Sequence, residues 1–390
     1  MAKLKKQQQS THSTLLAARR LTRRMVLKAA AATGLVVGIG PWPVKNALSS
    51  SGELNWFTWD DYNKPPYLED FTKETGIKLN VQVFPGNEDA LNKMRTSTEG
   101  IDVASPGLHW VTAYVDYDLV QPLESSRIPN INKMVPALRD RIETLGAVRD
   151  GKTYAIPLSW STEALVSAEG VPLEPGKTSY GIIWDEQYKG KMMCRARSVL
   201  TATGLWMEST GKMAPGSMRA AYTNEDAMRK SYGQVLDYAI AHKSQIVHFW
   251  KGGADQKAGL LEMGAVIGLA WDSVVFGLQG EGHALKFGAP SEGALTVMDS
   301  NVIVKGAKNI EQAYALINWA LKPETGALMT NNNGYNSVSV GSEQWYSDSY
   351  KKFFAAAYPG DAVDKLFIQG PETSWFIAAR QAMADKLLAA

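Results

Sequence analysis

The chain has 390 residues, of which 45% are hydrophobic and 21% are charged. This length and composition fit about two globular domains and exclude a chain that is disordered as a whole. The formal net charge of +2 hides an asymmetry, because residues 1–47 hold nine of the 41 lysines and arginines and no acidic residue. The other 32 basic residues face 39 acidic ones, which argues against a nucleic-acid-binding surface.

The N-terminal region has the layout of an export signal. A basic segment, TRRMVLK at 22–28, precedes a weakly apolar run at 29–40 and then Pro-Trp-Pro at 41–43. The apolar run is too short to cross a bilayer, which needs roughly 20 residues. Because the Arg-Arg pattern resembles a twin-arginine signal, we expect residues 1–47 to engage the twin-arginine export machinery and the mature protein to act in the periplasm. The alternative is a basic tail that contains Arg-Arg by chance.

The segment Leu54–Pro66, LNWFTWDDYNKPP, begins as a strand and continues into a loop that contains Trp59, Asp61 and Tyr62. An indole, a phenol and a carboxylate together suit an organic cation, because aromatic faces attract ammonium groups and a carboxylate supplies the opposite charge. A core strand followed by a polar turn is the alternative, since Trp and Tyr also fill cores.

Strands and helices alternate in the segment that follows, with a helix over 66–75, a strand over 78–84, a helix from Asn87 and a strand over 101–104. This alternation predicts an α/β fold with a parallel sheet. Ligands of such sheets bind outside the carboxyl ends of the strands, where the Trp59 loop and the loop at 105–110 are expected.

The remainder of the chain continues the mixed pattern. We predict a strand pair at 154–166 that passes through a polar hinge, helices at 199–209 and 223–241, strands at 264–271 and 297–304, and helices at 309–321 and 375–388. A turn-rich loop, NNNGYNS, lies at 331–337.

A set of motifs in this order resembles a known family: WFTWDDYNKPP with FTKETGIK, IDVASP, YAIPLSW, WDEQYKGK, GLAW, VMDS and NGYNS. Over most of residues 54–388, the chain is similar to the polyamine-binding (spermidine/putrescine) branch of bacterial extracellular solute-binding proteins, the periplasmic receptors of ABC importers. The resemblance implies a periplasmic-binding-protein-like fold with two α/β lobes, a ligand cleft and multiple crossover segments. It implies one lobe from 53–161 with 299–342 and another from 162–298 with 343–390.

The resemblance also implies site residues, six of which match the family: Trp59, Asp61, Tyr62, Trp271, Asp299 and Tyr335. They form one half-site, in which Asp299 anchors an ammonium group. The other half departs, because family positions for Ser, Tyr and Trp hold Gly107, His109 and Val297, and the expected carboxylate pair falls at Arg197 and Leu200. Among these we retain His109 and Arg197 as cleft residues.

Arg197 is the departure with a consequence for the ligand. It would repel the distal amine of a polyamine, because like charges in a cleft of low dielectric are unfavourable. We therefore hypothesise a ligand with an amine head near Asp299 and an anionic or neutral tail near Arg197, such as a zwitterionic amine derivative. In the alternative, Arg195 and Arg197 face solvent or pair with structural carboxylates.

Other functions have less support. Cys194 is the single cysteine and the histidines form no i,i+3 or i,i+4 pair, so we expect no metal site and no cofactor. Ferric iron in the same fold has only Tyr62 and Tyr335 as nearby phenols. A cleft hydrolase using Asp60 and Asp61 lacks any supporting motif. We expect a monomer that is not an enzyme, with a small organic amine as ligand, an ABC permease in the inner membrane as partner and no nucleic acid.

Overall fold

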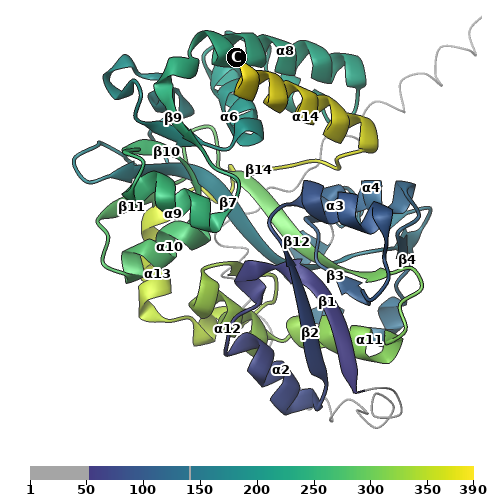
Figure 1. Ribbon diagram of the computed structural model, residues 1–390. Helices are drawn as coiled ribbons and strands as arrows, with labels where there is room; N and C mark the ends of the chain where they lie inside the picture. Colours follow the sequence, from purple (N-terminus) through teal and green to yellow (C-terminus); the bar gives the residue numbers. More distant parts are fainter. Residues whose placement is uncertain (1–51, 140–141) are drawn as a thin grey trace, which may run out of the picture.

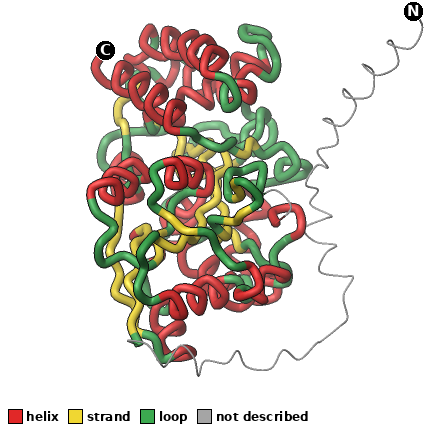
Figure 2. The backbone as a smooth tube through the Cα atoms, turned by 90° about the vertical axis from the view of Figure 1, so that its right-hand side faces the viewer, coloured by secondary structure: helices red, strands yellow, loops and turns green. Residues whose placement is uncertain are grey.

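The computed structural model describes residues 52–139 and 142–390, so the predicted export signal at 1–47 lies outside the described residues. Two α/β lobes are joined by two long strands, β7 (Ile156–Ala168) and β12 (Leu295–Val304). These strands pair antiparallel through the middle of the molecule (Figure 1). Figure 2 shows a group of helices at each end of the molecule, with strands running between them. The α/β fold predicted from the sequence is confirmed.

The first lobe is organised around three parallel strands, β1 (Glu53–Trp59), β2 (Lys78–Phe84) and β3 (Val103–Ala104). Trp56 of β1 lies opposite both Val81 of β2 and Val103 of β3. Since parallel strands end at the same edge of a sheet, Trp59 and the loop after Ala104 lie at the edge where ligands bind in such folds. Around these strands lie β4 (Val120–Gln121), α2 (Tyr67–Thr75), α3 (Asn87–Thr96), α4 (Val111–Asp116), α5 (Pro136–Arg139), α11 (Ile310–Ala320) and α12 (Pro323–Asn333).

The second lobe repeats this arrangement with other segments. β10 (Ile267–Trp271) pairs parallel with β8 (Met192–Cys194) and antiparallel with β7. The carboxyl ends of β8 and β10 therefore lie at one edge, with Arg195 directly after β8 and Trp271 as the last residue of β10. The lobe also contains β9 (Ile246–Phe249), β11 (Leu285–Gly288), α6 (Ala196–Ser209), α7 (Ser217–Ala220), α8 (Glu225–Ala241), α9 (Gly253–Leu261), α10 (Asp272–Gly280), α13 (Asp348–Ala357) and α14 (Ser374–Ala389).

The crossing strand β7 differs from the prediction of two strands separated by a polar hinge. It is continuous from Ile156 to Ala168. Its polar residues have distant partners, because Ser159 hydrogen-bonds the hydroxyl of Tyr62 and the backbone N–H of Thr162 donates to Asp272. β13 (Asn336–Ser337) pairs with the same stretch, and β14 (Phe367–Ile368) pairs with the start of β12.

The buried apolar side chains form separate clusters in the two lobes. One cluster draws on residues 54–158 and 298–338, and the other two draw on residues 164–295 and 350–387. The boundary between the clusters of the two lobes therefore lies within the crossing strands β7 and β12. The exact lobe boundaries, 53–161 with 299–342 and 162–298 with 343–390, stay a prediction.

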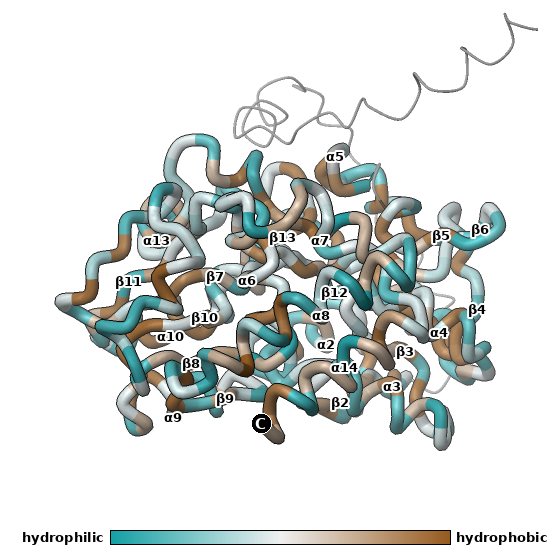
Figure 3. The backbone as a smooth tube through the Cα atoms, turned by 90° about the horizontal axis from the view of Figure 1, so that it is seen from above, coloured by the Kyte–Doolittle hydropathy of each residue, from teal (hydrophilic) through white to brown (hydrophobic). Residues whose placement is uncertain are grey.

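A hairpin of β5 (Val148–Arg149) and β6 (Lys152–Thr153) forms a separate two-stranded sheet at the edge of the molecule, where its residues are mostly hydrophilic (Figure 3). Its turn residues Asp150 and Gly151 both have positive φ, 51° and 71°, as the tight turns that suit hairpin twist require. In the described ranges, no helix has the length and apolar character needed to cross a membrane.

Candidate functional site

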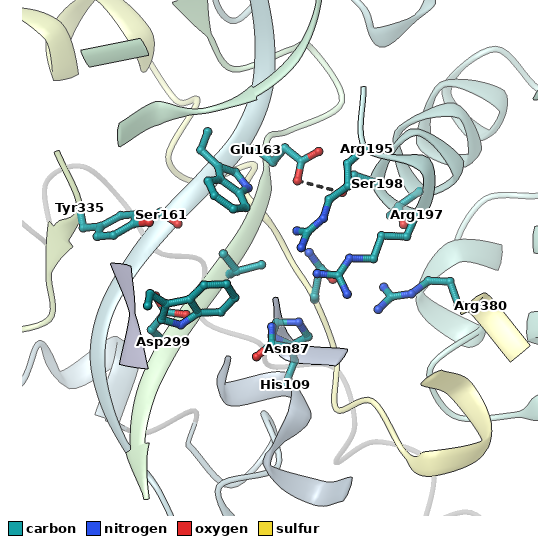
Figure 4. A pocket seen from close by; sticks show the side chains of 15 residues that line it. Asn87, His109, Ser161, Glu163, Arg195, Arg197, Ser198, Asp299, Tyr335 and Arg380 are labelled. Atoms are coloured by element: carbon teal, nitrogen blue, oxygen red, sulfur yellow. Dashed lines mark hydrogen bonds between the residues drawn. The ribbon is translucent and has the colours of Figure 1, made fainter. Parts of the chain in front are cut away.

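A cavity lies between the lobes, where the ends of β1 and β10 meet the crossing strand β12. Six predicted site residues line it: Trp59, His109, Arg197, Trp271, Asp299 and Tyr335. In Figure 4, Asp299 and Tyr335 lie on one side of the cavity, and the side chains of Arg195, Arg197 and Arg380 extend into it from the other. The two sides therefore carry opposite charge.

Two tryptophans, one from each lobe, meet at the cavity. The rings of Trp59 and Trp271 pack edge to face, with centroids 6.5 Å apart and an angle of 83° between their planes. Trp271 also packs edge to face against Trp250 at 5.3 Å. The indole N–H of Trp59 also acts on Asp299, because its hydrogen bond lowers the pKa of that carboxyl group. Such aromatic walls bury the alkyl part of a ligand and attract an ammonium group.

Asp299 is the acidic residue of this aromatic side. The register of β12 against β7 shifts between Asp299 and Ser300, and a bulge of this kind re-aims a side chain. Tyr62 donates a hydrogen bond to Oδ2 of Asp299 at 2.8 Å. Burial raises the pKa of Asp299 to about 7, although the Tyr62 hydrogen bond lowers it. In the part of the chain that the structure describes, Asp299 forms no ion pair, so its charge is available to an ammonium group.

Tyr62 and Asp61 do not line this cavity, unlike the other predicted site residues. Both belong to a 3₁₀ turn, η3 (Asp60–Tyr62), which follows β1. Tyr62 is only 1% exposed and lies behind Asp299, where it holds the carboxylate in place. Asp61 lies in an outer groove, accepts a hydrogen bond from the hydroxyl of Tyr335 at 2.8 Å and pairs with Lys64 at 3.3 Å.

Two arginines on the basic side of the cavity, Arg197 and Arg380, are each paired with a carboxylate. Arg197, in the first turn of α6, lines the cavity and also forms an ion pair with Glu88 at the start of α3, across the two lobes. Arg380, on α14, pairs with Glu372 in the preceding loop. The predicted alternative of pairing with a structural carboxylate therefore applies to Arg197 even though it faces the cavity.

Arg195 has a different environment from the other two arginines. It follows β8 and occupies the N-cap position of α6. Its guanidinium lies 5.4 Å from the ring centre of Trp271 and 5.5 Å from that of Trp250. No carboxylate of the described residues forms an ion pair with it. Burial, followed by the charge of Arg197, lowers the pKa of Arg195 to about 10. A group whose charge is disfavoured in this way gains from an anion placed beside it.

His109 lies on a 3₁₀ turn, η4 (Leu108–Trp110), at the border between the two sides. Burial, with the charges of Arg380 and Arg197, holds the pKa of His109 well below its usual value, so the ring is neutral at neutral pH. A Cβ on residue 107 would lie 2.7 Å from the imidazole, which explains why Gly107 accompanies this histidine.

Glu163, Arg195 and Arg380 were not among the predicted site residues. Glu163, on β7, accepts a hydrogen bond from Ser198 at 2.8 Å, and burial raises its pKa. One signal was present in the sequence, because Arg380 lies four residues after Phe376 and four before Ala384, on the buried face of the last helix. A charge inside an apolar stripe indicates a buried partner or a site.

Metal binding finds no support in the donor set. Within residues 52–139 and 142–390, no group of three or more His, Cys, Asp or Glu side chains is placed to hold a metal ion. The two phenols proposed for ferric iron are each engaged with a different carboxylate. Tyr62 donates a hydrogen bond to Asp299, and Tyr335 donates one to Asp61. Asp60, proposed for a hydrolase, is exposed in the outer groove.

Comparisons with known proteins agree with this architecture. The chain is similar to the spermidine/putrescine-binding periplasmic protein of Escherichia coli (strain K12), with 26% identity over 300 residues, 75% of this chain and 80% of that protein. Among solved structures it resembles a spermidine/putrescine ABC transporter substrate-binding protein of Streptococcus pneumoniae (TM-score 0.67, 22% identity, 86% of this chain and 98% of that one). It also resembles an apo ferric ion-binding protein A of Pasteurella haemolytica (TM-score 0.60, 18% identity, 87% and 98%).

These relatives are binding proteins rather than enzymes, and the solved structures share the two-lobed periplasmic-binding-protein fold that the sequence led us to expect. Residues 67–352 match the model of one protein family. The chain belongs to the bacterial extracellular solute-binding proteins.

Proposed function

We propose that the protein is the periplasmic receptor of an ABC importer and that it binds a small amine-bearing molecule in the cavity between its lobes. Relatives named for spermidine and putrescine support the amine, and the expected export signal supports the location. The observation that carries the proposal is Asp299, a buried carboxylate against tryptophan rings with no cation paired to it among the described residues.

The ammonium group of the ligand would take the place opposite Asp299. The two indoles come from different lobes, and Asp299 lies on a strand that both lobes share. A ligand that contacts all three therefore favours the closed arrangement, and its binding energy shifts the population of the receptor toward that state. The closed receptor would then dock on the permease.

Ferric iron remains an alternative only through the fold, because one solved neighbour is a ferric ion-binding protein. The described residues offer no matching cluster of ligands. If the protein develops no visible absorption band after ferric citrate is added, iron binding is excluded.

Replacement of Asp299 by Asn tests the amine proposal. The substitution keeps the shape of the side chain and removes its charge, so we expect butylamine and putrescine to bind about 2–4 kcal/mol more weakly, the range for breaking a desolvated charge pair. Isothermal titration calorimetry gives the affinity of each amine for each variant. Asp70→Asn, on the exposed face of α2, is the matched control and should leave both affinities unchanged. Equal amine affinities for wild type and Asp299→Asn would contradict the proposed function.

A further inference from the structure

We propose that the ligand carries a carboxylate as well as an amine, and that Arg195 binds this carboxylate at the end of the cavity opposite Asp299. The ligand class is then a short amino carboxylate rather than a diamine. This inference rests on the proposed function, because the ammonium at Asp299 fixes which end of the ligand reaches the arginines.

The pairing of the three arginines supports this assignment. Arg197 is paired with Glu88 and Arg380 with Glu372, so both guanidinium groups have their charge balanced by the protein. Arg195 has no ion pair within the described chain. Removing an arginine from water without a carboxylate partner is unfavourable, and an anionic ligand would supply that partner.

Glu88, the stronger of the two carboxylates that attract Arg195, is already paired with Arg197. The other is Glu163, whose contacts leave the arginine available. Its charge attracts Arg195, yet the two groups form no ion pair. One oxygen of Glu163 instead accepts a hydrogen bond from Ser198 at 2.8 Å, and burial raises the pKa of the carboxyl group. Glu163 thus hydrogen-bonds Ser198 and leaves the guanidinium of Arg195 without an ion pair among the described residues.

The position of Arg195 is also fixed before any ligand arrives. Its carbonyl accepts hydrogen bonds from the backbone N–H groups of Ser198 and Val199, which hold it at the start of α6. Its guanidinium lies over the faces of Trp250 and Trp271, so the planar group has little freedom to turn away. A planar guanidinium matches a carboxylate with two parallel hydrogen bonds, and the positive end of the 14-residue helix α6 adds to the attraction.

A diamine would meet the opposite situation. Its second ammonium would lie among three guanidinium groups, of which the protein balances two, and like charges at close range in a partly buried site repel one another. The cavity has a volume of about 40 Å³, three to four times the roughly 10–15 Å³ that one water needs on the same measure, which favours a chain of only a few carbons.

Three molecules of matched length test the inference on the wild-type protein: γ-aminobutyrate, putrescine and butylamine, each measured by isothermal titration calorimetry. We expect γ-aminobutyrate to bind at least about 10-fold more tightly than butylamine and about 100-fold more tightly than putrescine, because only the first places opposite charge beside Arg195. Homologues of γ-aminobutyrate with one carbon fewer and one more determine which chain length fits the cavity best.

Arg195→Gln and Arg229→Gln form a matched pair of variants, since each removes one positive charge and Arg229 is exposed on α8, outside the cavity. Arg195→Gln should remove the preference for γ-aminobutyrate over butylamine, whereas Arg229→Gln should leave that ratio unchanged. Thermal unfolding of both variants shows that the fold is intact, and Arg195→Lys should restore part of the preference.

The outcomes separate the inference from the proposed function. If putrescine binds as tightly as the amino carboxylates, or if Arg195→Gln leaves the preference unchanged, the inference is wrong while the amine site at Asp299 stands. If butylamine affinity does not depend on Asp299, the proposed function is wrong, whatever the carboxylates do.

Discussion

At one end of the cavity the carboxylate of Asp299 lies against tryptophan rings without a cation partner, whereas at the other end three guanidinium groups share two carboxylate partners. Tyr62, which lies behind the acidic end, donates a hydrogen bond to Asp299 and holds it in place. The basic end is assembled from α6, α14 and the start of α3. Among the described residues, Asp299 at one end of the cavity and Arg195 at the other both lack an ion pair. A binding site with this pattern selects for separated charges of both signs in its ligand.

The largest effect should come from breaking the internal balance of the basic end. Glu372→Gln would leave Arg380 buried without its partner, since the two residues are 0% and 4% exposed. We expect the free energy of unfolding to fall by about 3–5 kcal/mol, the usual cost of breaking a buried ion pair. Urea-induced unfolding of the ligand-free protein measures this.

The control for Glu372→Gln is Asp361→Asn, which removes one partner of the exposed Lys365–Asp361 pair at 3.1 Å. An exposed pair contributes at most about 1 kcal/mol. If Glu372→Gln lowers the free energy of unfolding by less than this amount, Arg380 does not depend on Glu372 for its charge balance. Two arginines of the cavity, rather than one, would then lack an effective partner.

The acidic end should make amine binding depend on pH. Because burial raises the pKa of Asp299 to about 7, the carboxylate is protonated below that pH and cannot attract an ammonium group. Butylamine stays charged throughout, so its affinity should fall about 10-fold for each pH unit below 7 and level off above pH 8. Titration calorimetry of wild type and Asp299→Asn checks this, and a slope that persists in the variant would point to another group.

The raised pKa of Asp299 also makes the stability of the ligand-free protein depend on pH. The folded state of an aspartate with a raised pKa binds its proton more tightly than the unfolded state, whose pKa is about 4. Its contribution to stability is therefore present below about pH 4 and is lost as the pH rises to about 7. Asp272, whose pKa burial also raises to about 7, adds a contribution of the same sign, so Asp299→Asn should remove only part of the effect.

The smallest effect is expected at the pair that joins the lobes. The pKa of Glu88 is lowered from its usual value because the charges of Arg197 and Arg195 outweigh the effect of burial, which raises it. Glu88→Gln would free Arg197 to share a carboxylate ligand. We expect the ratio of γ-aminobutyrate affinity to butylamine affinity to rise about threefold, comparable to the value of one partly exposed ion pair. An unchanged ratio would place Arg197 too far from the ligand to matter.

The sequence predicted much of the fold because its signals are local. The alternation of Leu79, Val81 and Val83 predicts β2, and Gly76 ends the preceding helix with a φ of 73°. The continuity of β7 could not be predicted in the same way. The partners of Ser159 and Thr162, Tyr62 and Asp272, lie 97 and 110 residues away and make a polar stretch acceptable inside a buried strand.

The candidate site shows the same contrast between local signals and contacts that are distant in sequence. Trp59, Trp271 and Asp299 stand at strand ends or at a bulge, and recurring motifs mark them. The roles of the arginines depend on which carboxylate each one meets, and Arg197 meets Glu88 across 109 residues of chain. Side-chain type and spacing identified a basic end but did not show which of its charges lacks a partner.

The crossing strand β12 has a consequence for how such receptors diversify. Asp299 lies in a strand that pairs with β3 of one lobe and with β7, so a change there disturbs ligand binding and the link between the lobes together. Arg195 instead stands at the start of α6, a helix of a single lobe, where exchange of a side chain leaves that link intact. We expect descendants of this receptor to acquire new ligand tails far more readily than new ligand heads.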